Sequence, residues 1–273
     1  MTTKTESKTA QAGEVRIHYL EEGSGEPVVC LHGAGPGASG WSNFRQNIGA
    51  LSKRYRVILP DLPGFGGSDK PLISEKPIAF SARTLAAFFD ALKLDRVSLV
   101  GNSAGGATSC RFAIDYPQRV RKIVLMGSAG AGFGVLGPQP PEGIRAMRAY
   151  FEAPSKDRMR ALIQTFVFDA SFLSDELLEE RYQQSLDPGH LEFMKKRAPL
   201  EDLSAEIGRI KAPTLIVWGA DDRFVPMEAG IKFLRLIPGA ELHVFSRCGH
   251  WVQVEHADRF NRLVMDFLGV GDK

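Results

Sequence analysis

The chain has 273 residues, which is enough for one large hydrophobic core and a sizeable insertion. Its composition, with 44% hydrophobic and 24% charged residues, is typical of a soluble globular protein. Because 34 basic residues nearly balance 32 acidic ones, the net charge is only +2. This charge gives no reason to expect nucleic acid or an anionic membrane surface as a partner.

The termini and the cysteines indicate the compartment. Residues 1–11 are polar and lack the apolar stretch of a secretory signal, and no apolar run is long enough to span a bilayer. Cys30, Cys110 and Cys248 lie far apart and form no Cys-x-x-Cys pair. We therefore expect reduced thiols, no metal site, no membrane association and a cytoplasmic protein.

Short apolar runs alternate with helix-like segments along most of the chain. The apolar runs predict strands at Pro27–Leu31, Tyr55–Leu59, Arg96–Val100, Lys122–Met126, Thr214–Trp218 and Glu241–Phe245. Helices are predicted at Phe44–Ser52, Ser81–Leu92, Ala104–Tyr116, Met227–Leu236 and Arg259–Leu268. Such alternation favours right-handed crossovers, and so predicts an α/β fold whose mostly parallel sheet carries helices on both faces.

The stretch between about residues 130 and 204 interrupts this alternation. Residues 130–141 are rich in Gly and Pro and predict a connector, after which only helices are expected, at Glu142–Phe151, Lys156–Phe168 and Asp175–Gln184. An all-helical insert between two strands predicts a cap over the carboxyl edge of the sheet, where open α/β sheets bind ligands. The expected organisation is a core of residues 1–130 and 205–273, with a helical cap at 131–204.

A Gly-x-Ser-x-Gly motif, Gly101 to Gly105, lies directly between a predicted strand and a predicted helix. The motif alone is weak, because a serine in a glycine-rich surface turn has the same letters. A sharp strand-to-helix turn, however, holds its serine exposed at the top of a sheet, as nucleophilic serines are held. This context predicts that Ser103 is a nucleophile.

A serine hydroxyl is a poor nucleophile near neutral pH and needs a base, which in turn needs an acid to orient it. His250 lies in a loop after the last predicted strand and is the candidate base. The acid should lie between the serine and the histidine in the chain, where Asp221 and Asp222 follow a strand. We choose Asp222 because the acid usually precedes the proline of such loops, here Pro226, by four residues; Asp221 is the alternative.

The oxyanion formed on nucleophilic attack needs backbone N–H donors. One is expected from Ala104, directly after the serine. The other is expected from Ala34, in the loop of small residues from His32 to Gly37, where the backbone can approach a substrate closely. His32 is expected to orient this loop. A glycine-rich turn without that function is the alternative.

These motifs resemble those of the meta-cleavage-product hydrolases, which have the α/β-hydrolase fold and cleave a carbon–carbon bond in 2-hydroxy-6-oxo-dienoates from aromatic-ring degradation. The similarity runs from about Glu14 to Leu268. It rests on His32–Phe44, Gly101–Ser103, Phe166–Asp169 with Arg181 downstream, Asp221–Pro226 and His243–Trp251.

The resemblance also implies the roles of several further residues. It places Asn43 and Asn102 at the polar head of the dienoate, Arg181 at its carboxylate, and Phe166 and Trp251 in the substrate pocket. It implies a small-molecule substrate, no cofactor and a homo-oligomer.

Two positions depart from the pattern of the family. Ala104 replaces a bulkier residue found in many relatives, and Ala34 stands where glycine is common. Both residues keep the N–H of the oxyanion hole, but the smaller Ala104 leaves open the shape of the pocket and the side chain of the substrate.

The expected reaction begins with tautomerisation of the dienol to a ketone. Ser103, or a water activated by His250, then attacks the 6-oxo group, giving a 2-hydroxy-dienoate and a carboxylic acid. The alternatives are a carboxylesterase or lactonase on the same fold and, from another class, a receptor that binds a small ligand without turnover. Arg181 distinguishes the first function from the second, because a dienoate has a carboxylate for it to bind and a neutral ester has none. Alternatively, Arg181 could extend toward solvent or pair with Glu180.

Overall fold

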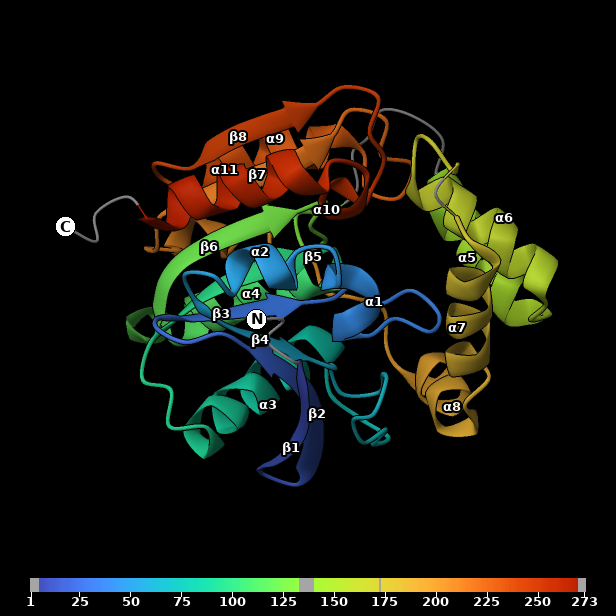
Figure 1. Cartoon of the computed structure of the whole chain (residues 1–273), viewed down its shortest axis with the longest axis horizontal. Coiled ribbons are helices and arrows are strands. Elements are labelled where there is room, and N and C mark those ends of the chain that lie inside the picture. The colour runs from blue at the N-terminus through green and yellow to red at the C-terminus, as the bar shows by residue number, and fades with distance from the viewer. Residues whose placement is uncertain (1–4, 133–139, 172, 270–273) are drawn as a thin grey trace.

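The structure, a computed structural model, describes residues 5–132, 140–171 and 173–269 (Figure 1). These residues form one eight-stranded sheet in the order β1-β2-β4-β3-β5-β6-β7-β8. The pairs β1–β2 and β2–β4 are antiparallel, and all other neighbours are parallel. The strands are β1 Glu6–Ala12, β2 Val15–Glu22, β3 Pro27–Leu31, β4 Arg56–Pro60, β5 Val97–Asn102, β6 Val120–Met126, β7 Thr214–Gly219 and β8 Glu241–Phe245. The predicted mostly parallel sheet is confirmed.

The sequence-based prediction misses the first two strands. β1 is largely exposed and polar, so neither an apolar run nor a clear alternation marks it. It forms a strand because it pairs with β2 along its whole length, from Glu6 opposite Glu21 to Ala12 opposite Val15. Pairing at the edge of a sheet can make a strand of a segment whose own preference is weak.

Helices cover both faces of the parallel part of the sheet, as predicted. The residues of β3 show why: Val29 and Leu31 pack into one hydrophobic cluster, whereas Val28 and Cys30 pack into another on the opposite face. The first cluster includes α3 Pro77–Ala91, α4 Ala104–Asp115 and α9 Met227–Leu236. The second includes α1 Gly40–Phe44, α2 Ile48–Leu51 and α11 Ala257–Gly269. Strands buried on both faces are apolar throughout, which is why they could be read from the sequence.

Two helix predictions differ from the structure by more than two residues. The helix expected at Phe44–Ser52 is instead the two short helices α1 and α2. Helix α3 begins four residues earlier than expected, with Pro77 in its first turn, where proline is favoured because that N–H has no partner in the helix.

The insertion between β6 and β7 contains only helices in its described part. These helices are α5 Glu142–Glu152, α6 Lys156–Phe166, α7 Asp175–Ser185 and α8 Pro188–Lys196, of which α8 was not predicted. Figure 1 shows them grouped at one side of the sheet, apart from the helices that cover its faces. Most of the predicted glycine- and proline-rich connector, residues 133–139, lies outside the described residues.

No helix in the described ranges is both long and apolar enough to cross a membrane.

Candidate active site

Ser103 lies in a strained turn between β5 and α4. Its φ of 54° is in the left-handed region that residues with a Cβ avoid, and its N–H donates to the carbonyl of Met126 on the neighbouring strand. Two residues further on, a Cβ on Gly105 would lie 2.2 Å from the carbonyl oxygen of Leu31. Glycine is therefore required there for the helix to pack against β3, and this packing holds the turn in place.

His250 and Asp222 form a buried pair at the same edge of the sheet. His250 Nδ1 donates to Asp222 Oδ2 over 2.7 Å, and both side chains are inaccessible to solvent. The other carboxylate oxygen, Oδ1, accepts the backbone N–H groups of Phe224 and Val225 at 2.8 and 2.9 Å. These bonds fix the carboxylate, which in turn fixes the orientation of the imidazole.

Asp221, the alternative acid, lies in a different environment. Its side chain is exposed, and its Oδ2 accepts the backbone N–H of Cys248 at 3.3 Å. Its own backbone N–H donates to the carbonyl of Cys248. Asp221 therefore supports the loop that carries His250 and does not contact the imidazole.

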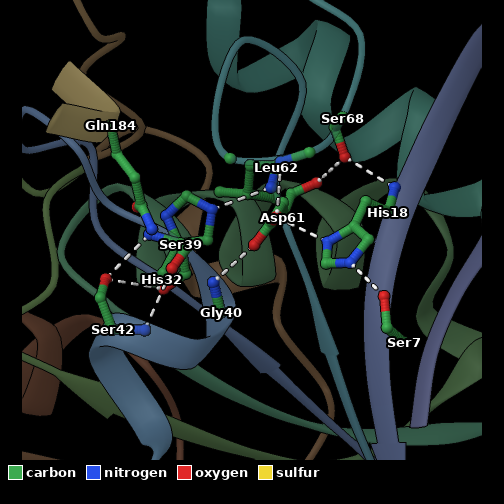
Figure 2. Close-up of polar contacts among 12 residues, drawn as sticks. Ser7, His18, His32, Ser39, Gly40, Ser42, Asp61, Leu62, Ser68 and Gln184 are labelled. Atoms are coloured by element: carbon green, nitrogen blue, oxygen red, sulfur yellow. Dashed lines mark hydrogen bonds and ion pairs between the residues drawn. The ribbon is translucent and has the colours of Figure 1, made fainter. Parts of the chain in front are cut away.

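The loop after β3 runs beside Ser103. Ala34 lines the same small cavity as Ser103 and His250, and Ala104 is the first residue of α4, so its N–H is not used within the helix. His32 Nε2 accepts the N–H of Leu62 (Figure 2), and Nδ1 donates to the carbonyl of Gly33 at 2.7 Å. Burial lowers the pKa of His32, consistent with a neutral ring that ties this loop to the loop after β4.

Asp61 connects the beginning of α1 to the sheet. Its carboxylate accepts the N–H of Gly40 and the Nδ1–H of His18, both at 2.8 Å (Figure 2), and the N–H of Gly67 at 2.9 Å. Burial by itself would raise the pKa of Asp61, but these hydrogen bonds hold it below its ordinary value. The carboxylate thereby fixes α1, the helix that carries Ser42 and Asn43 into the site.

The two predicted asparagines both line the cavity and are buried. Asn43 Oδ1 accepts the N–H of Gly33, and Asn102 Nδ2 donates to the carbonyl of Met126. Asn102 Oδ1 has no hydrogen-bond partner among the described residues. A buried, unpaired carbonyl oxygen is costly, so this atom is available to a ligand that brings a donor.

Arg181 is buried on the inward face of α7, with Leu177 and Leu178. Its Nη1 donates to Ser42 Oγ at 3.3 Å, its guanidinium carbon lies 5.3 Å from the ring of Trp251, and its Nε has no partner in the described structure. Glu180, the neighbour considered from the sequence, pairs instead with Arg45.

No carboxylate of the described residues lies within ion-pair distance of Arg181, although its side chain is only 1% exposed. Burial is the main reason that its pKa falls to about 10, which leaves the group charged near neutral pH. A buried charge of this kind is costly without a partner, so the guanidinium would attract an anionic ligand that enters the cavity.

Aromatic rings fill most of the space above Ser103. The Phe166 ring stacks almost parallel to Phe224, with centroids 4.0 Å apart, and to Trp251, with centroids 4.5 Å apart. It therefore lies between them, and the cavity left beside Ser103 measures only about 20 Å³. Ligand pockets usually measure roughly 300–1,000 Å³. The side chain of Phe166, at the end of cap helix α6, therefore occupies space that a larger ligand would need.

Three contributors to this site were not predicted from the sequence. Ser42 contacts Arg181, Phe224 forms one wall of the aromatic stack, and Glu255 accepts backbone N–H groups beside the loop of His250. Phe224 could have been found, because it follows the Asp-Asp-Arg motif directly. Glu255 is the last residue of the four-residue helix Val252–Glu255 and carries no sequence signal. In the ranges that the structure describes, no group of three or more His, Cys, Asp or Glu side chains is placed to hold a metal ion.

A serine in a strained strand-to-helix turn, a buried His–Asp pair and a mostly parallel sheet with a helical insertion are together typical of the α/β hydrolases. The family model described as alpha/beta hydrolase fold matches residues 26–257, and the chain belongs to this family. Within it, the chain is a member of the meta-cleavage-product hydrolases, as the resemblance predicted.

Relatives and solved structures agree on this placement. The chain is 46% identical to a 2-hydroxy-6-oxo-6-phenylhexa-2,4-dienoate hydrolase of Burkholderia cepacia, over 94% of this chain and 92% of the relative. It is 45% identical to a 2-hydroxy-6-oxononadienedioate/2-hydroxy-6-oxononatrienedioate hydrolase of Comamonas testosteroni, with the same coverage. The structure of a meta-cleavage product hydrolase from Pseudomonas fluorescens IP01 matches with a TM-score of 0.88 and 39% identity, over 96% of this chain and 97% of that one.

Proposed function

We propose that this protein hydrolyses a carbon–carbon bond in a 2-hydroxy-6-oxo-dienoate, giving a 2-hydroxy-dienoate and a carboxylic acid. The observation that carries the proposal is the buried guanidinium of Arg181 in the cavity of Ser103 and His250, for which the described residues supply no carboxylate partner. A dienoate has a carboxylate that can pair with this guanidinium, whereas a neutral ester or lactone has none. The names of the relatives at 45–46% identity support the same substrate class.

In the proposed binding mode, the carboxylate of the substrate pairs with Arg181 through two charge-assisted hydrogen bonds. Asn43 and Asn102 lie beside the polar head of the substrate, and the unpaired Oδ1 of Asn102 can accept from its 2-hydroxyl group. Phe166 and Trp251 line the dienoate. Both side chains line the cavity of Ser103, which supports this arrangement, since flat aromatic walls suit a flat conjugated chain once the Phe166 ring has moved out of its stack with Trp251.

In the proposed reaction, the bound dienol first becomes a ketone by moving a proton from its hydroxyl to the conjugated chain. Ser103 Oγ then adds to the 6-oxo carbon while His250 takes its proton, and the N–H groups of Ala34 and Ala104 stabilise the oxyanion. When the carbon–carbon bond breaks, its electrons pass through the conjugated chain to the 2-oxo oxygen. This oxygen receives the proton from His250 and becomes the hydroxyl group of the 2-hydroxy-dienoate. Water activated by His250 then releases the acid from Ser103. Asp222 holds the imidazole throughout, as its 2.7 Å hydrogen bond supports.

The test compares wild-type protein with Ser103→Ala on two substrates. Yellow ring-fission products of several catechols lose their colour on cleavage, and p-nitrophenyl esters report esterase activity. We expect wild-type turnover of the dienoates to exceed that of the esters, and Ser103→Ala to lose about three or more orders of magnitude in kcat while still binding substrate.

The same experiment separates the rival functions. Ester hydrolysis without dienoate cleavage would support a carboxylesterase, and tight binding without turnover of either substrate would support a receptor. Dienoate cleavage by Ser103→Ala within a few-fold of wild type would remove the serine from the mechanism.

We also propose the boundaries of the core and the cap, the oligomeric state of the protein and its cellular compartment. A core of residues 1–130 and 205–273 with a cap at 131–204 is supported by the helices that separate β6 from β7. Three free, buried cysteines support a reducing compartment such as the cytoplasm. A homo-oligomer is implied by the resemblance alone, and light scattering of the purified protein tests it.

A further inference from the structure

The end of cap helix α6 lies directly against the loop that carries His250. The carbonyl of Phe166 accepts the backbone N–H of His250 at 2.7 Å, so the cap and the proposed catalytic base share a hydrogen bond. The next residue, Val167, packs so closely that a Cβ on Gly249 would lie 2.8 Å from its Cα atom. Residues 166–169, which we call the cap strap, therefore contact the same loop that must hold the imidazole in place.

One carboxylate bridges the cap strap and this loop. Glu255, the last residue of α10 Val252–Glu255, accepts the N–H of Gly249 through Oε1 at 2.7 Å. Its Oε2 accepts the N–H groups of Phe168 and Asp169 at 2.7 and 3.2 Å. One oxygen therefore binds the histidine loop, and the other binds the cap strap.

The loop of His250 needs such support. Arg247, three residues before His250, has a φ of 53°, which costs free energy for a residue with a Cβ. A strained loop keeps its conformation only when its surroundings determine it. Burial is the main reason that the pKa of Glu255 lies above its usual value, and the bonds from Gly249, Asp169 and Phe168 act in the opposite direction. The contacts to both segments therefore help to keep this half-buried carboxylate charged.

We propose that Glu255 is a positioning residue that joins the cap strap to the histidine loop, so that His250 is held in its working position only while the strap is docked. The proposal rests on the function proposed above. Neither glutamine nor aspartate can replace the carboxylate of Glu255. Glutamine presents an NH2 group where one set of N–H donors needs an acceptor, and aspartate is shorter by one methylene and cannot span the two segments.

The test compares Glu255→Gln with the matched control Asp258→Asn. Asp258 is an exposed acid in the first turn of α11, three residues away along the chain. Measurements are kcat and KM on a dienoate and on a p-nitrophenyl ester, the thermal midpoint, and hydrogen exchange of residues 164–171 and 247–251. We expect Glu255→Gln to lower kcat about 10–100-fold on both substrates, as for a displaced catalytic group, with KM within about three-fold. The hydrogen-exchange rates of the Gly249, Phe168 and Asp169 amides should rise together. The control Asp258→Asn should change neither kcat nor these exchange rates.

Two results would overturn the positioning role alone. One is a kcat of Glu255→Gln within about two-fold of the wild-type value, and the other is a rise in KM with kcat unchanged. Wild-type protein that turns over neither substrate would overturn the proposed function and the positioning role with it. If Glu255→Gln does not fold, exchange in the wild-type protein decides the question. Glu255 as a single clamp requires one common opening free energy for the Gly249, Phe168 and Asp169 amides, and clearly different values would refute it.

Discussion

Replacing Arg181 by glutamine should make the protein more stable and, at the same time, a much poorer dienoate hydrolase. Burial lowers the pKa of this group well below its ordinary value, to about 10. A difference of that size corresponds to a cost of roughly 3 kcal/mol for keeping the charge inside the folded protein. Glutamine removes this cost but also loses the contact with Trp251, which offsets part of the effect. We therefore expect a net gain of about 1–3 kcal/mol in the free energy of unfolding.

The direction of this effect depends on pH in a defined way. The folded-state pKa lies below the unfolded one, so the cost is fully present below pH 10 and is relieved only as the pH rises through about 10. Thermal or urea unfolding at pH 7 therefore measures the whole stabilisation in Arg181→Gln. The matched control is Arg160→Gln, an exposed cap arginine paired with the exposed Asp175, which should change stability by less than about 1 kcal/mol.

Activity should move in the opposite direction. Losing a desolvated guanidinium–carboxylate pair should cost about 2–4 kcal/mol in kcat/KM for a dienoate, which is roughly 30- to 1,000-fold. Hydrolysis of a neutral ester should change little, because that substrate has no carboxylate. Equal losses on both substrates, or a destabilised Arg181→Gln protein, would show that Arg181 is a structural residue and would refute the reasoning.

Further predictions follow from the same geometry. Asp222→Asn should lower kcat by about 10⁴-fold through a misoriented His250, and Asp221→Asn far less; steady-state kinetics in which Asp221→Asn is the more damaging change would reverse the assignment. Gly37→Ala should lose about 2 kcal/mol or more in urea unfolding, because φ is +61° and the new Cβ would lie 2.1 Å from the carbonyl oxygen of Arg181; an unchanged midpoint would contradict this close approach. All three cysteines are buried with raised pKa values, so a thiol reagent should label them only after unfolding, and rapid labelling of the native protein would speak against this burial.

The local sequence was sufficient where a segment's own pattern matches its environment. Most of the parallel strands are buried on both faces, so their apolar runs predicted them correctly, and the insertion showed helical periodicity without strands. The strand–Gly-x-Ser-x-Gly–helix context predicted the turn at Ser103, which the structure shows with positive φ. The same helical spacing that placed Arg181 on the side of Leu177 and Leu178 agrees with its burial.

Only the tertiary structure decided features that depend on a distant partner. The polar segment Glu6–Ala12 becomes a strand because β2 offers it an edge, and no local pattern records that edge. Asp221 and Asp222 are chemically identical neighbours, and only the loop conformation turns one toward His250 and the other toward Cys248. Among the described residues, the lack of a carboxylate beside Arg181 and the bridge made by Glu255 have the same origin, since hydrogen bonds and ion pairs join residues far apart in the chain. A sequence shows which groups are present, but folding determines which of them remain unpaired.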